Sequence, residues 1–345
     1  MSSGWRRLVW LVPLGFLALT FALAWHFDRD FWRPASSLMH LAQEAAQRQD
    51  YPRSLELARK AVSRDPQNSG YRLALAQIYL DAGKPQASLD LSRRLTPQGA
   101  ETSQVLALQA RALERLGDRR AALKLLAGAL KDNPDNAEIL GLAAALAAKE
   151  DDDQPLAVTY YQRLYAVTRD PLARRRLADL LTSLNRFEEA IPLQEEEAAQ
   201  YPENPEALHR LALLHYWRRD YQAAGRIYQQ LLEKTASDAA LRLEAARNAE
   251  AGHQTDQALA HYLWLYSRNQ GKKEYAVALA KLWSQKGNHA EAAGILAPLM
   301  QDNPDPELRR RYALELLLIG DMGQALKTYQ AAWAAGDTHQ ETIIN

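Results

Sequence analysis

The sequence contains no cysteine, and this absence excludes several classes of function. Its 345 residues offer no thiol nucleophile, no disulfide and no cysteine ligand for zinc. The chain also has no excess charge of either sign, because its 42 basic and 42 acidic side chains cancel. Nucleic-acid-binding proteins usually carry a basic excess. We therefore expect no nucleic-acid partner, no thiol chemistry and no disulfide-stapled fold.

Recognisable catalytic and cofactor-binding motifs are missing as well. The sequence has no nucleophile elbow, no phosphate-cradling glycine loop and no zinc-protease helix. His209 and His215 share a predicted helix, but a spacing of six residues places them on different faces. The acidic run at residues 150–153 lacks the alternating ligands and the turn glycine of a calcium loop. We expect no catalytic residues, no metal ligands and no cofactor.

One long apolar run lies near the N-terminus. Leu8–Phe27 contains 20 residues without an acidic or basic side chain, enough for a helix to cross about 30 Å of hydrocarbon. Because Arg6 and Arg7 precede this run, the positive-inside rule keeps residues 1–7 in the cytoplasm. We predict a single-pass inner-membrane anchor at 8–27, a juxtamembrane linker at 28–34, and a periplasmic location for the rest.

A cleaved signal peptide is the alternative interpretation of the same segment. Ala22-Leu23-Ala24 offers the small-x-small pattern of a cleavage site. The apolar run continues past that site to Phe27, which favours an uncleaved anchor.

After this segment, an alanine returns every 34 residues. The series is Ala42, Ala76, Ala110, Ala144, Ala178, Ala212, Ala246 and Ala280, with Leu314 in ninth place. A strict period of this length indicates a stack of helix pairs. Repeats in one register begin at Ala35, Ser69, Ser103, Ala137, Pro171, Pro205, Ala239, Lys273 and Glu307. Within each repeat, apolar spacings of three and four residues predict two amphipathic helices.

The pattern resembles the tetratricopeptide repeat, which has small residues at repeat positions 8 and 20 and proline at position 32. The alanine series supplies position 8, Ala122 and Ala190 are examples at position 20, and Pro66 and Pro134 are examples at position 32. The resemblance implies an all-α, right-handed superhelical solenoid of about nine helix pairs over residues 35–340, following the membrane helix.

Two repeats depart from the pattern. Repeat five has Pro192 inside its second helix and Glu197 where a small apolar residue is usual, which predicts a late start or a kink. Repeat nine reaches Gly320 and Ala325 one place early.

The last five residues, 341–345, match the start of a tenth repeat. Solenoids normally end in a helix with a polar outer face. We therefore expect either a longer repeat protein or a partner that covers this end of the array.

The family resemblance also nominates binding residues, because positions 2, 5, 9, 12 and 13 of the first helices line its concave groove. The candidate groove residues are Arg111, Arg115, Arg175, Asp179, His209, Tyr216, Trp217, Arg247, Lys281 and Arg311. Basic groups beside two aromatic rings predict an acidic, extended peptide or a saccharide as ligand. The alternative is that the charges are merely solvated and that Trp217 packs on the next repeat. Position 9 never holds asparagine, so the clamp of chaperone-binding members is missing.

An anchor followed by a long cysteine-free repeat array resembles the N-terminal part of exopolysaccharide export proteins of the PelB type. That resemblance implies a periplasmic scaffold for biofilm exopolysaccharide export that recruits a partner protein, such as a polysaccharide-modifying enzyme, with polysaccharide as a further possible ligand. The alternative function is an inner-membrane co-chaperone or complex-assembly factor for exported proteins.

Overall fold

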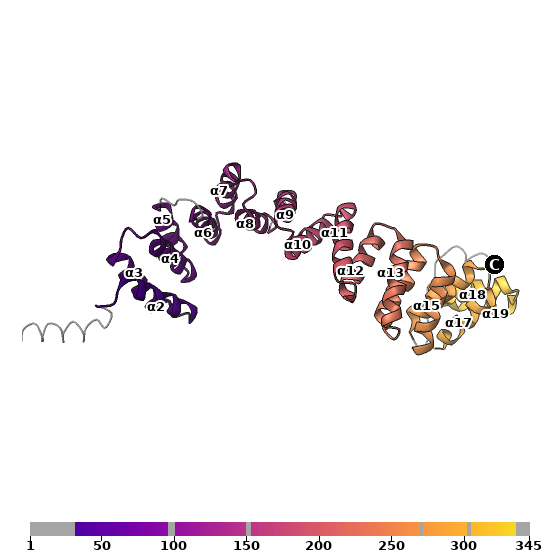
Figure 1. Ribbon diagram of the computed structural model, residues 1–345. Helices are drawn as coiled ribbons and strands as arrows, with labels where there is room; N and C mark the ends of the chain where they lie inside the picture. Colours follow the sequence, from indigo (N-terminus) through magenta and orange to yellow (C-terminus); the bar gives the residue numbers. More distant parts are fainter. Residues whose placement is uncertain (1–31, 96–100, 150–152, 270–271, 302–304, 336–345) are drawn as a thin grey trace, which may run out of the picture. The chain divides into compact units, whose positions relative to one another are not determined.

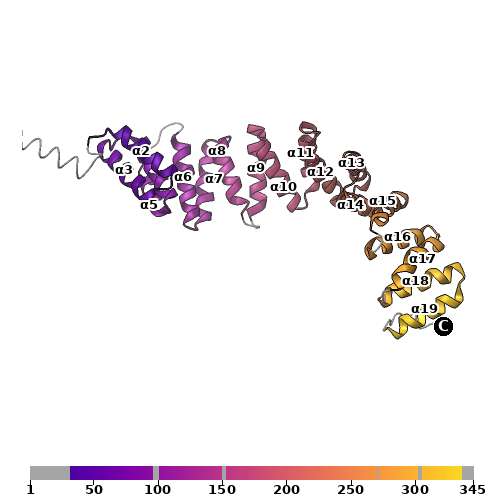
Figure 2. The ribbon, with the colours of Figure 1, turned by 90° about the horizontal axis from the view of Figure 1, so that it is seen from below.

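The computed structural model describes residues 32–95, 101–149, 153–269, 272–301 and 305–335. In these ranges helices are joined by short turns and loops (Figures 1 and 2). They contain eighteen α-helices in nine pairs and no strand, which confirms the all-α repeat fold. The predicted anchor Leu8–Phe27 and the start of a tenth repeat at 341–345 lie outside the described residues. Within the ranges given above, no helix has both the length and the apolar character needed to cross a membrane.

The first helices of the pairs begin close to the predicted repeat starts. They are α2 (Ala35–Gln47), α4 (Ser69–Asp81), α6 (Glu101–Arg115), α8 (Ala137–Ala147), α10 (Pro171–Ser183), α12 (Pro205–Trp217), α14 (Ala239–Ala251), α16 (Lys273–Gln285) and α18 (Pro306–Ile319). Seven of the nine begin at the predicted residue, so the 34-residue register holds from the first repeat to the eighth.

The second helices complete the nine pairs; most of them lie against the first helix of the same pair, and seven lie against the first helix that follows. They are α3 (Tyr51–Arg64), α5 (Pro85–Arg93), α7 (Arg119–Asp132), α9 (Gln154–Thr168), α11 (Phe187–Gln200), α13 (Tyr221–Lys234), α15 (Thr255–Arg268), α17 (His289–Leu296) and α19 (Met322–Ala334). The short 3-10 helix η2 (Ala297–Met300) continues α17.

Small residues at positions 8 and 20 meet where the two helices of a pair touch. On the first helices, Ala42, Ala76, Ala110, Ala144, Ala212 and Ala246 are fully buried. On the second helices, Ala122, Ala190, Ala224, Ala258 and Ala292 are fully buried. The hydroxyl of Ser54, at position 20, donates a 2.7 Å hydrogen bond to the backbone oxygen of Ala42, at position 8. Because the helices approach this closely, a larger side chain at either position would overpack the contact.

The turn inside each pair uses one left-handed residue, always at position 15. Positive φ angles between 56° and 92° occur at Gln49, Gly83, Gly117, Asn185, Arg219, His253, Gly287 and Gly320. The next N–H then donates back to the carbonyl oxygen of position 11, as from Asp118 to Leu113 at 2.9 Å. This arrangement ends the first helix and satisfies one of its last carbonyl groups. The equivalent residue of repeat four, number 151, lies outside the described residues.

Side-chain caps begin many of the helices and repeat with the same period. Second helices are capped at position 16 by Asp50, Asp118, Asp220 and Asp321. First helices are capped by Asn68, Asn136, Asn204, Asp238 and Asp305. Each carboxylate or amide oxygen accepts a backbone N–H two or three residues further on, which satisfies a donor that the helix leaves unpaired.

Two details of the sequence interpretation are wrong. The ninth repeat begins at Pro306 instead of Glu307, so Ala313, and not Leu314, is its fully buried small residue. The early Gly320 is therefore part of a shift of the whole ninth repeat. In repeat five, only the late start is wrong, because α11 begins at position 17 like α3, α7 and α13; the helix contains Pro192 as predicted.

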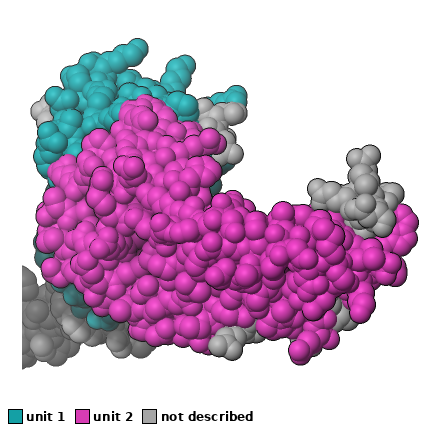
Figure 3. Space-filling view, turned by 90° about the vertical axis from the view of Figure 1, so that its right-hand side faces the viewer, with its two compact units in different colours: residues 1–174 teal, residues 175–345 magenta. Residues whose placement is uncertain are grey.

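The chain divides into two compact units, residues 1–174 and 175–345 (Figure 3). Within the first unit, one core cluster joins α2, α3 and α4 through residues such as Leu38, Ala58 and Ile78. Within the second unit, another joins α14, α15 and α16 through residues such as Ala246, Tyr262 and Leu279. Each cluster links one helix pair to the first helix of the next pair. The free energy of unfolding is therefore roughly the sum of the stabilities of the single repeats and of the interfaces between neighbouring repeats.

The outer face of the ninth repeat is apolar and exposed. Large exposed side chains on α18 and α19 are Leu317, Leu318, Ile319, Met322, Leu326 and Trp333. Leu326 is 46% exposed, whereas Leu259, at the same position of repeat seven, is 4% exposed beneath α16. In most earlier repeats, the equivalent apolar surface is buried beneath the first helix of the next repeat.

The left-handed turn residue gives a matched pair of stability tests. Gly117→Arg should lower the free energy of unfolding by about 1–2 kcal/mol, because a side chain strains this backbone conformation. Arg219→Gly should raise it by up to about 1 kcal/mol, since the relief of that strain exceeds the entropic cost of glycine. Urea unfolding followed by circular dichroism measures both. A loss of stability in Arg219→Gly would contradict this account of the turn.

Candidate functional site

In the first unit, two candidate groove residues stand one turn apart on α6. Arg111 and Arg115 are exposed, and neither makes a hydrogen bond or ion pair with any residue that the structure describes. A pocket of about 530 Å³ is lined by Leu106, Gln109 and Leu113 of the same helix, together with residues of α5 and α7. The two arginines do not line that pocket, so they remain solvent-facing cations.

In the second unit, a pocket of about 180 Å³ lies between α10 and α12. Its lining residues are Ala178, Asp179, Thr182, Gln194, Arg210, Leu213, Leu214 and Trp217. The structure therefore brings the candidates Asp179 and Trp217 to one site, which we call the Trp217 pocket. Trp217 is 46% exposed, and its ring lies 6.2 Å from that of Phe187 on α11. Its aromatic neighbour thus belongs to the preceding repeat, and a large part of the indole faces solvent.

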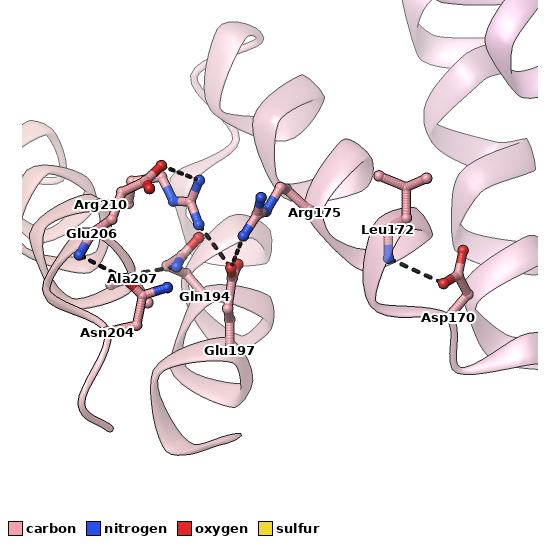
Figure 4. A network of polar contacts seen from close by, with 9 residues as sticks. All are labelled: Asp170, Leu172, Arg175, Gln194, Glu197, Asn204, Glu206, Ala207 and Arg210. Atoms are coloured by element: carbon pink, nitrogen blue, oxygen red, sulfur yellow. Dashed lines mark hydrogen bonds and ion pairs between the residues drawn. The ribbon is translucent and has the colours of Figure 1, made fainter. Parts of the chain in front are cut away.

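A buried carboxylate links the three helices around this pocket (Figure 4). Glu197 on α11 is only 3% exposed. Its Oε1 atom accepts hydrogen bonds from Arg175 of α10 at 2.6 Å and from Arg210 of α12 at 2.7 Å. Arg210 also reaches Glu206 at 3.3 Å. The hydrogen bond to Glu197 holds the pKa of Arg175 above its ordinary value. This arrangement explains why position 27 of repeat five holds glutamate instead of a small apolar residue.

The candidate cations further along the second unit are also paired with acids. His209 Nε2 lies 2.5 Å from Glu244 Oε2. The remaining pairs are Arg247 with Glu274 at 2.6 Å, Lys281 with Glu250 at 2.8 Å, and Arg311 with Glu307 at 2.7 Å. The hydrogen bond that Arg247 donates to Glu274 raises the pKa of Arg247. Among the basic candidates, only Arg111 and Arg115 lack an acidic partner within the described ranges, so the basic charge expected from the sequence is largely neutralised.

A buried tyrosine donates a hydrogen bond to one of these acids, and a second tyrosine contact holds a candidate ring. Tyr262 of α15 donates a 3.1 Å hydrogen bond to Glu250. Burial raises the pKa of the Tyr262 hydroxyl well above its usual range, and the Glu250 carboxylate adds to this effect. The candidate Tyr216 makes an edge-to-face contact with Tyr221 of α13, with centroids 5.8 Å apart. Both contacts fix groups on the first helices in place.

A second pocket of the same unit, about 210 Å³, lies between α16 and α18. Lys281 and Arg311 line it together with the buried Glu315, which contacts His289 at 2.8 Å. Nowhere in the described part of the chain do three or more histidine, aspartate or glutamate side chains form a group that could hold a metal ion. The chemistry on offer at both pockets is apolar contact and ion pairing.

Sequence reasoning missed the acidic partners, and some of them could have been found. Glu206, Glu250 and Glu274 occupy positions 2 and 12 of their repeats, which are among the five groove positions. Counting the acids at those positions as well as the basic and aromatic residues would have revealed them. Glu197 and Arg210 occupy positions 27 and 6, outside the groove pattern, so only the packed helices bring them to the site.

Comparisons with known proteins agree with the repeat architecture. Two family models, both described as tetratricopeptide repeat, match residues 45–112 in one case and residues 108–173, 142–205 and 175–240 in the other. A tetratricopeptide repeat protein from Parabacteroides merdae is a similar solved structure, with 18% identity, coverage of 71% of this chain and 97% of that chain, and a TM-score of 0.40. A thermophilic TPR protein of Thermus thermophilus has 20% identity, coverage of 52% and 98%, and a TM-score of 0.38. No curated protein matches the chain.

The Glu197 network predicts an unequal response to two similar substitutions. Glu197→Ala should lower the free energy of unfolding by about 1–3 kcal/mol, because it leaves partly buried arginine donors without their acceptor. Glu203 forms an exposed ion pair with Lys234 at 2.8 Å, so Glu203→Ala should cost no more than about 0.5 kcal/mol. Thermal melting followed by circular dichroism compares them. Equal losses would show that the buried carboxylate has no special structural role.

Proposed function

Because this chain belongs to the tetratricopeptide repeat family, we propose that it is a membrane-anchored periplasmic scaffold that recruits a partner protein for exopolysaccharide export and biofilm formation. The family is typically non-enzymatic, and its repeats hold other proteins. Helix pairs that bury their faces only against neighbours leave their first helices open to a ligand within each unit. We place partner binding on the first helices of the second unit.

The Trp217 pocket is the observation that carries this proposal. Binding hot spots are enriched in tryptophan and arginine set in well-packed surroundings. Trp217 is almost half exposed, while Arg210 beside it is fixed by Glu197 and Glu206. Exposure of a large aromatic surface to water is unfavourable for an isolated protein. The same surface contributes binding energy when a partner covers it, because its neighbouring side chains are already fixed.

The location and the process rest on the sequence. The run Leu8–Phe27, preceded by Arg6 and Arg7, supports an inner-membrane anchor with the repeats in the periplasm. The combination of one anchor with a long cysteine-free repeat array supports a role like that of PelB-type export proteins. In that role the partner is a periplasmic polysaccharide-modifying enzyme, with polysaccharide itself as a further possible ligand.

Recovery of the full tagged chain from detergent-solubilised membranes, followed by mass spectrometry, tests the proposal. We expect one stable periplasmic partner and an N-terminus at Met1. Trp217→Ala should reduce recovery of the partner, while Leu263→Ala, which alters a large apolar side chain of similar exposure on the second helix α15, should not.

Two results would overturn the proposal. A mature N-terminus at Trp25 would remove the anchor. Recovery of many unfolded exported proteins, without one stable partner, would indicate the co-chaperone or assembly function instead.

A further inference from the structure

The Trp217 pocket offers a largely apolar surface on which the polar groups other than the Asp179 carboxylate are engaged within the protein. Ala178 and Leu214 are each 3% exposed and form its buried part. The Thr182 hydroxyl donates to the backbone oxygen of Ala178 at 2.7 Å. The Gln194 amide donates to the backbone oxygen of Ala207 at 3.2 Å. A ligand rich in hydroxyl groups would find few free hydrogen-bonding partners here, which disfavours a saccharide.

The size of the pocket limits what it can hold. Its volume of about 180 Å³ is below the range of about 300–1,000 Å³ that small-molecule and cofactor sites occupy. A space of this size accommodates one large side chain. The exposed face of Trp217 then supplies favourable contact for an aliphatic or aromatic group. The pocket therefore fits the anchor residue of a polypeptide better than a whole small molecule.

The charge around the pocket favours a basic neighbour to that anchor residue. Arg175 and Arg210 are both held by Glu197, and Arg210 also contacts Glu206, so two cations face two anions. Asp179 is exposed on the pocket wall and adds a third anion, which interacts electrostatically with Arg175 one helical turn away. Its carboxylate is left to attract a lysine or arginine of the ligand.

From these three observations we infer that the Trp217 pocket binds a partner segment in which a large apolar residue lies next to a basic residue. The inference rests on the proposed scaffold function and specifies its partner. At this pocket it reverses the sign of the ligand expected from the sequence, because Arg175, the candidate cation there, is engaged by Glu197.

A random peptide library displayed on phage supplies the probe for a direct test. The full chain in detergent micelles serves as the target, and fluorescein-labelled copies of the selected peptides are measured by fluorescence anisotropy. We expect the selected peptides to share leucine, methionine or phenylalanine beside lysine or arginine. Their affinity should fall with rising salt, because attraction to the exposed Asp179 is screened.

Substitutions then locate the binding. Trp217→Ala should weaken the peptides by about tenfold or more, as removal of a hot-spot side chain does. Asp179→Asn should weaken them several-fold and reduce the salt dependence. Leu263→Ala, at an exposed apolar residue of α15, is the control and should leave affinity unchanged. Because Trp217 and Asp179 are both exposed, their substitution should leave the melting temperature unchanged. This measurement verifies that a loss of affinity does not come from unfolding.

Several outcomes would overturn the inference. Selection of acidic peptides, or an equal loss of affinity in Trp217→Ala and Leu263→Ala, would contradict it. Binding of glucosamine oligosaccharides that depends on Trp217, with no peptide binding, would make the occupant a glycan.

Failure of this inference is distinguishable from failure of the scaffold proposal. A stable periplasmic partner still recovered with the Trp217→Ala chain would overturn the pocket assignment alone. Selected peptides that bind at Trp217, from a chain with no cellular partner, would overturn the scaffold proposal alone.

Discussion

The contact between small residues at positions 8 and 20 is the constraint on which the rest of this structure depends. Ala246 and Ala258 are both fully buried, one on each helix of repeat seven. With alanine at such points, the two helices of a pair can approach closely, and each pair presents one apolar face to the next first helix. A fixed period of 34 residues then places equivalent side chains on successive first helices in equivalent surroundings.

This regular spacing also brings acidic and basic side chains of successive first helices within ion-pair distance, which neutralises most of the basic candidates of the second unit. Lys281 on α16 reaches back to Glu250 on α14, and Arg247 on α14 reaches forward to Glu274 on α16. Glu197 serves the same purpose from a second helix, where it holds one arginine from each of two first helices. The ligand chemistry proposed for the Trp217 pocket follows from the groups that these ion pairs leave exposed, which are the Trp217 indole and the Asp179 carboxylate.

Most of the fold could be predicted from the sequence because its determinants recur. The small residues at positions 8 and 20 repeat often enough to fix the register, and seven first helices start where that register predicts. That register does not predict the start of the ninth repeat at Pro306. The loss of one residue before this repeat leaves only the early Gly320 and Ala325 as signs in the sequence. The left-handed turn at Arg219 was likewise hidden, because arginine carries no turn signal. The candidate site residues were chosen by their positions within the repeat. The acidic side chains that pair with them depend on packing between helices, which the repeat pattern does not describe.

The most direct test of this account compares two neighbouring residues of α14. Ala246→Leu should lower the free energy of unfolding by about 1–3 kcal/mol through overpacking of the contact with α15. Arg247→Leu removes only an exposed ion pair and should cost no more than about 1 kcal/mol. Chemical unfolding of the full chain, followed by circular dichroism, measures both. A clearly larger loss for Ala246→Leu is the predicted result, and equal losses would contradict the role assigned to the small-residue contact.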